Sequence, residues 1–314
     1  MFTPVVTVLM PVYNGDKFLA AAIESILTQT FRDFELIVVD DGSFDSSNEI
    51  IKKYQIKDPR VILITQENEG IVAALNKALF SARGYFCMRM DADDVCLPDR
   101  IEKQLNFLKE NSEVFVVGGQ GYIIDEEGDF IRPLPVLVMH DEINDDLLYR
   151  FNSRAIIHPA VMFRTDEIRK IGGYRDGYLW AEDLDLFLRV AEVGKLANLD
   201  SVVIHYRKHG NSITDKKSVV QRNSAIKATN DARLRRGMPI VSYNDSIFDS
   251  TEESPLDSMY STATSALSSG WRKTSIKYLR RMVSEYGLTH QAVKLSLKIA
   301  AAPFNKINSL DHVA

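Results

Sequence analysis

The sequence is poor in cysteine and contains no long apolar run. Two cysteines, Cys87 and Cys96, are present in 314 residues. Two thiols form neither a disulfide framework nor a zinc-type ligand cluster, and this usage fits a reduced, cytoplasmic compartment. No stretch approaches the roughly 18 apolar residues that a membrane span needs. The first residues lack the basic segment of a secretory signal, so we expect no signal peptide. We expect any contact with a membrane to occur from the cytoplasmic side.

The chain also lacks an excess of positive charge. Lys and Arg number 38 against 43 Asp and Glu, a net charge of −5, which gives no reason to expect a nucleic-acid partner. Hydrophobic residues make up 45%, which is ample for a core. We find no internal repeat and no low-complexity tract. A length of 314 residues predicts one large domain with an appendage.

Short apolar runs alternate with helical spacing through the first part of the chain. Strands are expected at 5–12, 34–39, 61–65 and 85–90. Helices are expected at 17–29, 47–54, 68–82 and 100–111, with Asp45 or Ser46 capping the second and Gly84 closing the third. Later strands are expected at 114–124, 156–163 and 202–206, the second of them interrupted by His158-Pro159. A turn is expected at 125–129, and helices at 141–151, 182–193 and 217–236. This alternation predicts an α/β fold whose sheet is covered by helices on both faces.

The composition changes near residue 214. We predict a catalytic domain at 1–214, a helix and acidic linker at 215–257, and a helical basic region at 258–314. Within the linker, 244–257 carries five acids and no base, whereas Trp271–Lys306 carries eight bases and one acid. This basic region has two readings: the solvated face of a small helical appendage, or a surface for peripheral contact with anionic lipid at the inner face of a membrane.

Three polar loops leave expected strands, at Pro11–Gly15, Asp40–Ser43 and Asp91–Asp94. Ligands of open α/β sheets bind at the carboxyl ends of the strands, so these loops predict a nucleotide crevice. Tyr13 can stack on a base, and Asp40 or Asp41 can accept a base N–H. The alternative is a rim aromatic beside a turn that caps a helix.

Three carboxylates, Asp91, Asp93 and Asp94, follow the apolar run at 85–90. Two carboxylates separated by one residue can point toward a single ion. Mg²⁺ and Mn²⁺ prefer oxygen ligands and often share them with substrate phosphates. For these residues taken alone, an acidic loop that caps the next helix is the alternative.

Several segments together resemble the family-2 glycosyltransferases. They include Val-Thr-Val-Leu-Met-Pro-Val-Tyr-Asn-Gly (6–15), the segment 25–43 with its Val-Val-Asp-Asp-Gly-Ser end, and Met-Asp-Ala-Asp-Asp (90–94). The resemblance continues through His158-Pro159, Gly172-Gly173-Tyr174, Ala181-Glu182-Asp183 and Tyr206-Arg207-Lys208-His209, and so covers about 4–214. It implies a GT-A fold, with a Rossmann-like mixed sheet, and an inverting enzyme that uses a nucleotide sugar.

The resemblance also implies roles for individual residues. Asp183 matches the catalytic base, and Asp91, Asp93 and His209 match metal ligands for Mg²⁺ or Mn²⁺. The nucleotide, commonly with uracil as its base, is expected to be bound by Pro11, Tyr13, Asp40, Asp41, Asn68, Asp91, Ala92 and Asp93. The expected substrates are a nucleoside-diphosphate sugar and a glycan or lipid-linked acceptor of the cell envelope.

Some assignments stay open at the level of sequence. His209 is either a metal ligand or a surface histidine, and His158 is either an acceptor-side or a structural residue. Tyr178 and Trp180 are either an acceptor platform or core aromatics. A phosphatase of the haloacid-dehalogenase type does not fit, because the spacing around Asp40-Asp41 is wrong. A non-catalytic homologue that binds nucleotide sugar is the remaining rival.

Overall fold

The computed structural model describes residues 3–151, 155–209, 218–241 and 254–302. Within these ranges the chain forms two compact units. The first unit contains 3–121, 135–206 and 218–241, and the second contains 122–134, 207–209 and 254–302. The expected division at residue 214 stays a prediction. The second unit includes a segment from the middle of the expected catalytic domain.

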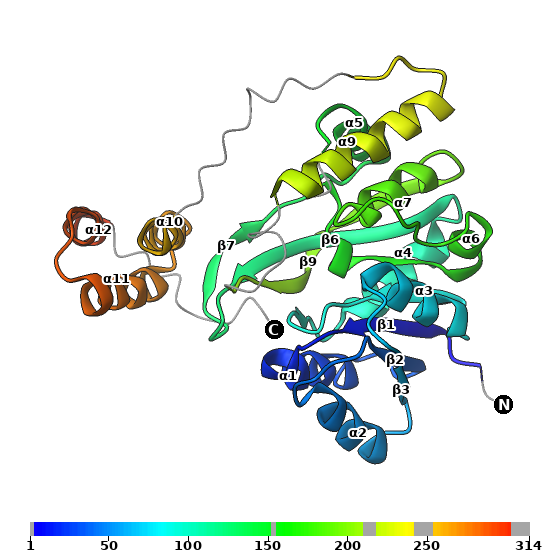
Figure 1. The fold of residues 1–314 in the computed structure, drawn as a ribbon, viewed down its shortest axis with the longest axis horizontal. Helices are drawn as coiled ribbons and strands as arrows, with labels where there is room; N and C mark the ends of the chain where they lie inside the picture. Colours follow the sequence, from blue (N-terminus) through cyan, green and yellow to red (C-terminus); the bar gives the residue numbers. More distant parts are fainter. Residues whose placement is uncertain (1–2, 152–154, 210–217, 242–253, 303–314) are drawn as a thin grey trace. The chain divides into compact units, whose positions relative to one another are not determined.

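The first unit is built around a mixed sheet in the order β3-β2-β1-β4-β8-β6-β9-β5 (Figure 1). Its strands are β1 Val6–Val12, β2 Phe34–Asp40, β3 Val61–Thr65, β4 Phe86–Arg89, β5 Val95–Cys96, β6 Val114–Ile124, β8 Met162–Arg164 and β9 Lys195–Arg207. β1 to β4 are parallel, β8 is antiparallel to both β4 and β6, and β5 is antiparallel to β9. The predicted α/β fold with a mixed sheet is confirmed.

Eight helices of the described chain belong to this unit. They are α1 Asp16–Leu27, α2 Ser47–Lys57, α3 Ile71–Ser81, α4 Arg100–Glu110, α5 His140–Tyr149, α6 Thr165–Lys170, α7 Glu182–Val190 and α9 Ser218–Arg235. Alternate strand residues such as Leu9 and Ile37 pack with α3, α5 and α7 in one large apolar core. This core fixes the strand ends from which the polar loops emerge.

The structure corrects several local expectations. The interruption expected at His158-Pro159 is present as a 3-10 turn, His158–Ala160, because Pro159 has no N–H to donate to a sheet, but the strand β8 begins only at Met162. β9 begins at Lys195, well before the expected 202. Gly84 does not close α3, whose cap is Ala82. Gly84 instead lies against β1, where an added Cβ would come within 2.6 Å of the Thr7 nitrogen. Asp45, rather than Ser46, accepts the Ser47 N–H at the start of α2.

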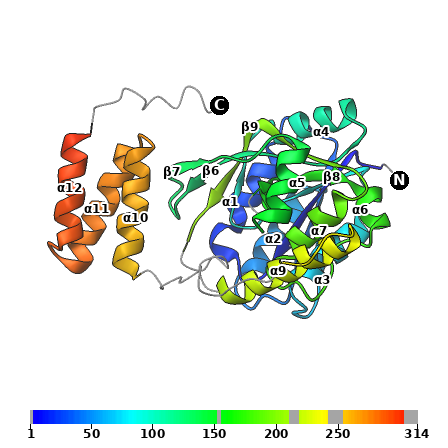
Figure 2. The same ribbon diagram turned by 90° about the horizontal axis from the view of Figure 1, so that it is seen from above.

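The second unit combines three helices with the tip of a β hairpin. The helices α10 Pro255–Ser268, α11 Arg272–Tyr286 and α12 His290–Ala301 lie side by side in both views (Figures 1 and 2). They share a small apolar core formed by Ala263, Met282, Ala292, Leu295 and Ile299. No helix in the described parts of the chain is both long and apolar enough to cross a membrane.

The hairpin tip connects β6 to β7, Phe130–Leu134, and is held by α11. The Trp271 ring stacks on Phe130 with centroids 4.8 Å apart, and Thr274 Oγ1 donates to the Phe130 carbonyl at 2.9 Å. Lys277 forms ion pairs with Asp125, Glu127 and Asp129. The expected acidic turn is therefore present, and a lysine far along the chain compensates its charge.

Candidate active site

Polar loops leave β1, β2 and β4 at one edge of the sheet, as predicted. Val12 pairs with Asp40 across β1 and β2, and Leu9 pairs with Arg89 across β1 and β4. The loops that follow also touch: the Asp41 N–H donates to the Val12 carbonyl at 2.8 Å. A Cβ added to Gly15 would lie 3.6 Å from the Ala92 Cβ. The register therefore brings Pro11, Tyr13, Asp40, Asp41, Asp91, Ala92 and Asp93 to one edge.

The loop after β1 is tied to the loop after β2. The Asn14 N–H donates to Ser43 Oγ at 2.9 Å, and the Phe44 N–H donates to Asn14 Oδ1 at 3.0 Å. Asn14 adopts a left-handed backbone with φ of 50°, which asparagine tolerates better than most residues. Tyr13 and Phe44 are left exposed, at 51% and 83%. A flat ligand can therefore reach both rings.

Asp40 and Asp41 are buried and hold the loops in shape. Asp40 accepts the Ser43 N–H at 3.0 Å and the Asn48 side-chain amide at 2.7 Å. Asp41 accepts the Gln66 side-chain amide at 2.7 Å and the backbone N–H groups of Glu69 and Gly70 at 2.9 Å each. A carboxylate oxygen has two lone pairs, so these bonds leave Asp41 some capacity for a further donor.

Asn68 lies in the loop between β3 and α3, beside the Asp-Asp-Gly turn. Gly42 has a φ of +76°, and an added Cβ would come within 2.9 Å of the Asn68 backbone nitrogen. Only glycine fits this close approach without a shift of the backbone. The Asn68 side chain is exposed. It therefore lies at the rim of the edge where the resemblance places the nucleotide.

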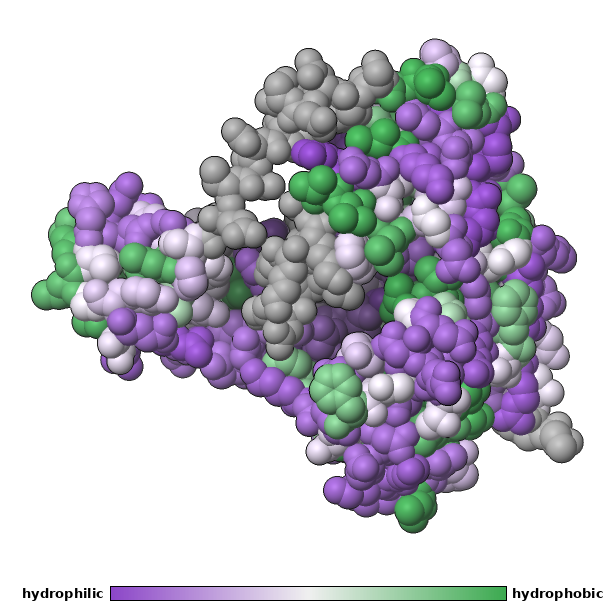
Figure 3. All heavy atoms as spheres, in the orientation of Figure 1, coloured by the Kyte–Doolittle hydropathy of each residue, from purple (hydrophilic) through white to green (hydrophobic). Residues whose placement is uncertain are grey.

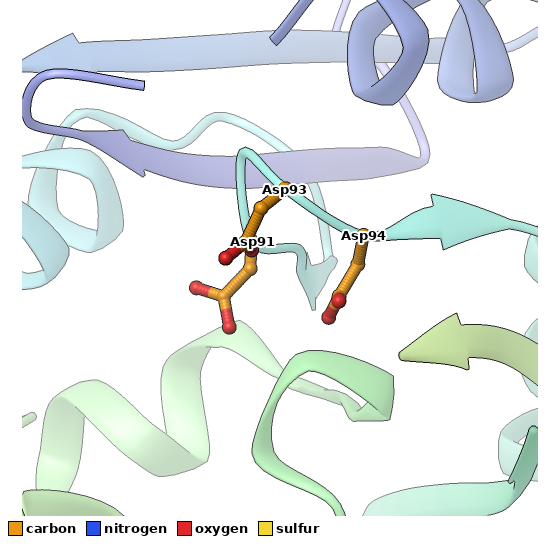
Figure 4. A group of neighbouring side chains, drawn as sticks. All are labelled: Asp91, Asp93 and Asp94. Atoms are coloured by element: carbon orange, nitrogen blue, oxygen red, sulfur yellow. The ribbon is translucent and has the colours of Figure 1, made fainter. Parts of the chain in front are cut away.

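Three carboxylates gather after β4. Asp91, Asp93 and Asp94 each offer an oxygen, and these oxygens lie within 4.8 Å of one another. Figure 4 shows the three side chains leaving the short loop between β4 and β5 on the same side. Burial raises the pKa of the Asp91 carboxyl, and Asp93 adds to that rise. An all-oxygen donor set of this kind fits Mg²⁺ or Mn²⁺.

A buried arginine lies directly beneath this loop. Arg89 is 4% exposed, and its guanidinium lies 2.5 Å from Asp91 Oδ2. A second buried arginine, Arg100 of α4, donates to the Arg89 carbonyl at 2.9 Å and to the Val161 carbonyl at 3.2 Å. It is braced by Gln104 at 3.0 Å. Two fixed cations and an amide therefore position the acidic loop at the end of β4.

Glu182 and Asp183 begin α7 and share the electrostatic field of this loop. Burial raises the pKa of Glu182 to about 7 and that of Asp183 to about 6, while Arg89 lowers both. Asp91 raises both values, so the two groups of acids lie close enough to affect each other. The Leu184 N–H donates to Asp183 Oδ1 at 2.7 Å. Asp183 combines the elevated pKa and the fixed orientation of a general base.

The start of α7 is anchored by a buried ion-pair network. Asp185 is fully buried and accepts from Arg189 Nε at 2.9 Å and from Arg175 Nε at 3.0 Å. Arg189 also donates to the Ile171 and Gly173 carbonyls at 2.9 and 2.6 Å. Every charge in this network has a partner, which a buried pair requires. The network therefore fixes the helix end that carries Asp183.

The structure shows the surroundings of three residues whose roles the sequence left open. His158 is buried, with Nε2 2.8 Å from the Tyr174 hydroxyl, and burial holds the pKa of its imidazole well below the usual range. Tyr178 is also buried and donates to Asp231 at 2.6 Å. Both side chains therefore have hydrogen-bond partners inside the protein, as a structural role requires. Trp180 is half-buried, with a left-handed φ of 61°, and lies two positions before Glu182.

His209 belongs to the second unit, where it follows β9 with a half-buried side chain. Its role as a metal ligand stays a prediction. Its neighbour Arg207 is buried and donates to the Asp125 and Glu126 carbonyls at 2.9 and 3.0 Å. Arg207 therefore braces the hairpin turn within the second unit.

Sequence reasoning gave no site role to Arg89, Arg100 or Glu182. A signal was present for Arg89, which is the one charged residue in the apolar run at 85–90 and directly precedes the acids. A charge inside a buried strand must be paired, and Asp91 was the nearest acid. For Arg100 and Glu182 the sequence offers no comparable signal.

Comparison with known proteins identifies the family. The model of glycosyl transferase family 2 matches residues 7–172. The chain is 36% identical over 212 residues to the O-antigen biosynthesis glycosyltransferase WbnJ of Escherichia coli, which covers 66% of this chain and 81% of that protein. The recognised family is confirmed, and the chain is a glycosyltransferase of that family.

Solved structures share the fold. The S. aureus TarS 1–349 complex with UDP-GlcNAc matches with a TM-score of 0.56 and 19% identity, over 95% of this chain and 81% of that chain. The mannosyltransferase PcManGT from Pyrobaculum calidifontis, in complex with GDP-Man and Mn²⁺, matches with a TM-score of 0.54 and 16% identity, over 98% and 82%. The predicted GT-A fold is confirmed.

Proposed function

The chain belongs to glycosyl transferase family 2, and on that basis we propose that it is an inverting enzyme that uses a UDP-sugar donor. The acceptor is a hydroxyl of a lipid-linked or polysaccharide glycan of the cell envelope. One observation carries the proposal: Asp91, Asp93 and Asp94 cluster at the end of β4, at the same edge of the sheet as the loops that follow β1 and β2. UDP-GlcNAc in the TarS complex supports the choice of donor class.

Asp183 is the base of the proposed reaction. Its carboxylate accepts the proton of the acceptor hydroxyl while the oxygen attacks the anomeric carbon, and the bond from that carbon to the diphosphate oxygen breaks. Attack opposite the leaving group inverts the configuration at the anomeric carbon. Trp180, two positions before Glu182, is the aromatic residue that we propose to contact the apolar face of an acceptor sugar.

Asp91, Asp93 and Asp94 would hold Mg²⁺ or Mn²⁺, while the expected role of His209 as a metal ligand stays a prediction from the sequence. A bound divalent ion supplies positive charge for the leaving nucleoside diphosphate. The donor set of three clustered carboxylates fits this role. Mn²⁺ in the PcManGT complex supports the same class of ion. Arg89 meanwhile holds Asp91 in place from below.

The nucleotide is bound by the loops at the sheet edge. Tyr13 stacks on the base, Asp41 accepts a base N–H with Asp40 behind it, and Pro11, Asn68 and Ala92 complete the rim. We place the enzyme in the cytoplasm, in peripheral contact with the inner face of a membrane through Trp271–Lys306. Of this region, Lys306 lies outside the described residues.

A donor screen tests the proposal most directly. The enzyme is incubated with UDP- and GDP-sugars in the presence of Mg²⁺ or Mn²⁺, and release of the nucleoside diphosphate is measured with and without glycan acceptors. We expect metal-dependent release from one donor. Binding of a nucleotide sugar without turnover, for every donor and acceptor tried, would favour the non-catalytic homologue.

A further inference from the structure

An exposed apolar patch lies on the second unit, and the chemistry above gives it no role. Its members run from the end of α11 into α12: Val283, Tyr286, Leu288, Val293 and Leu297, with exposures of 38, 43, 81, 46 and 66%. We call these five residues the α11–α12 patch. Figure 3 shows apolar residues at the outer surface of these helices, next to hydrophilic ones.

The apolar residues of α12 form two stripes. Ala292, Leu295 and Ile299 face the small core of the unit. Val293 and Leu297 are one turn apart on the opposite, exposed side. A helix that needs only to pack on its neighbours requires one apolar stripe. The outer stripe is therefore not explained by packing within the described part of this unit.

The turn between the helices holds Leu288 outward. Gly287 ends α11 with a φ of 74°, and its N–H donates to the Val283 carbonyl at 3.0 Å. Thr289 begins α12, where its side chain accepts the Ala292 N–H at 3.1 Å. Both neighbours of Leu288 are thus fixed by caps. The most exposed member of the patch is presented on a defined backbone.

Exposed cations border the patch. Lys294 and Lys298 lie one turn apart on α12, and both are exposed; Lys298 Nζ also lies 5.3 Å from the centroid of the Tyr260 ring on α10. Two of the cations that the sequence suggested for a basic surface are instead paired with acids. Lys277 and Arg281 are ion-paired with the acidic hairpin turn. Four exposed cations remain on these two helices, Lys273 and Arg280 on α11 and Lys294 and Lys298 on α12.

We propose that the α11–α12 patch binds the surface of an anionic lipid bilayer. Leu288, Val293 and Leu297 enter the headgroup region, and Lys294 and Lys298 contact lipid phosphates. Apolar side chains flanked by cations have the character of interfacial helices. Pairing of two copies through this face would bring like charges together, which disfavours self-association. This inference rests on the membrane contact named in the proposed function and assigns it to these residues; it can fail while glycosyl transfer stands.

Co-sedimentation of the full chain with vesicles tests the contact. One vesicle type is phosphatidylcholine and the other contains about 30% phosphatidylserine, each at low and high salt. We expect pelleting with the anionic vesicles that falls as salt rises. A cation near such a surface contributes about fivefold to binding, so Lys294→Gln with Lys298→Gln weakens it roughly 25-fold. Leu297→Ser weakens it about tenfold.

Matched controls come from the first unit. Ile56 on α2 is 86% exposed, and Lys52 and Lys53 on the same helix are exposed. Ile56→Ser and the double change Lys52→Gln with Lys53→Gln should leave lipid binding unchanged. Equal pelleting with both vesicle types, or none with either, would overturn the proposal. A dimer that Leu297→Ser dissociates would assign the patch to self-association instead. Donor hydrolysis, measured in parallel, reports on the proposed function separately.

Discussion

The rings of Tyr13 and Phe44 meet edge to face, with centroids 6.2 Å apart and an angle of 83° between their planes. Both rings are exposed, and the loops that carry them are joined by the two hydrogen bonds through Asn14. An edge-to-face contact restricts how far the Tyr13 ring can turn. Phe44 therefore orients the ring that is expected to stack on the donor base.

We expect Phe44→Ala to weaken UDP binding about three- to tenfold, because an aromatic pair of this kind contributes about 0.5–1.5 kcal/mol. Calorimetric titration of UDP measures the change, and pyrophosphate, which has no base, should bind as before. Phe80→Ala is the matched control, since Phe80 is also an exposed aromatic in the first unit. An equal loss for UDP and pyrophosphate would argue against contact with the base.

Removal of divalent ions should abolish activity. Asp91, Asp93 and Asp94 lie together as a set of oxygen donors, and the cation that pairs with Asp91 is the buried Arg89. We expect excess chelator to stop donor turnover and added Mn²⁺ or Mg²⁺ to restore it. Asp93→Asn should raise the Mn²⁺ concentration for half-maximal activity at least tenfold. Full turnover in chelator would contradict the metal site.

Replacement of Asp183, the proposed base, should separate turnover from nucleotide binding. Asp183→Asn keeps the size of the side chain but removes the proton acceptor, so we expect kcat to fall by about 10²-fold or more with little change in UDP affinity. Asp176→Asn, at an exposed carboxylate of the same unit, is the control and should change neither kcat nor UDP affinity. If UDP affinity falls as much as turnover, Asp183 is a binding residue.

The elevated pKa of Asp183 predicts how activity depends on pH. A base acts when ionised, and burial raises the pKa of this carboxyl to about 6. Activity should therefore be full above that value and decline as the pH falls through it. The profile of kcat/KM between pH 5 and 8 shows the decline. A rate that stays flat down to pH 5 would mean that the base titrates elsewhere.

The ion pairs of Lys277 should stabilise the second unit. Lys277→Met leaves Asp125, which is 1% exposed, without its counter-ion, so we expect a loss of about 1–3 kcal/mol in the free energy of unfolding. Urea unfolding measures the loss. The control is Lys273→Met, at an exposed position one turn earlier on α11. If the two variants have similar free energies of unfolding, these ion pairs give no net stabilisation.

Local pattern was enough to predict the parallel half of the sheet and its loops. The runs that became β1 to β4 are short, apolar and separated by helical spacing, and parallel connections place their ends at one edge. Asp91 and Asp93 could be proposed as ligands because they follow such a run directly. The contacts of Arg100 could not be predicted, since they depend on Val161, 61 residues away in sequence.

The second unit shows a different limit. The acidic turn at 125–129 and the basic region after Trp271 were both visible in the sequence, but their pairing was not. Lys277 and Asp125 are separated by 152 residues, and several acidic segments could have paired with the same bases. Charge attracts without specifying a partner. The stacking of Trp271 on Phe130 brings α11 to the acidic turn at 125–129 and so determines which acids Lys277 meets.

The hairpin held by α11 has a consequence for any attempt to prepare the catalytic domain alone. A protease site or stop codon placed in the acidic linker would remove α10 to α12 but leave the hairpin behind. The remaining fragment would carry the Tyr122 and Phe130 rings without the indole that covers them. It would also keep Asp125, Glu127 and Asp129 without Lys277, which forms ion pairs with all three. Such a fragment would be prone to aggregate, so a shortened enzyme needs a redesigned turn between β6 and β7 as well as a new C-terminus.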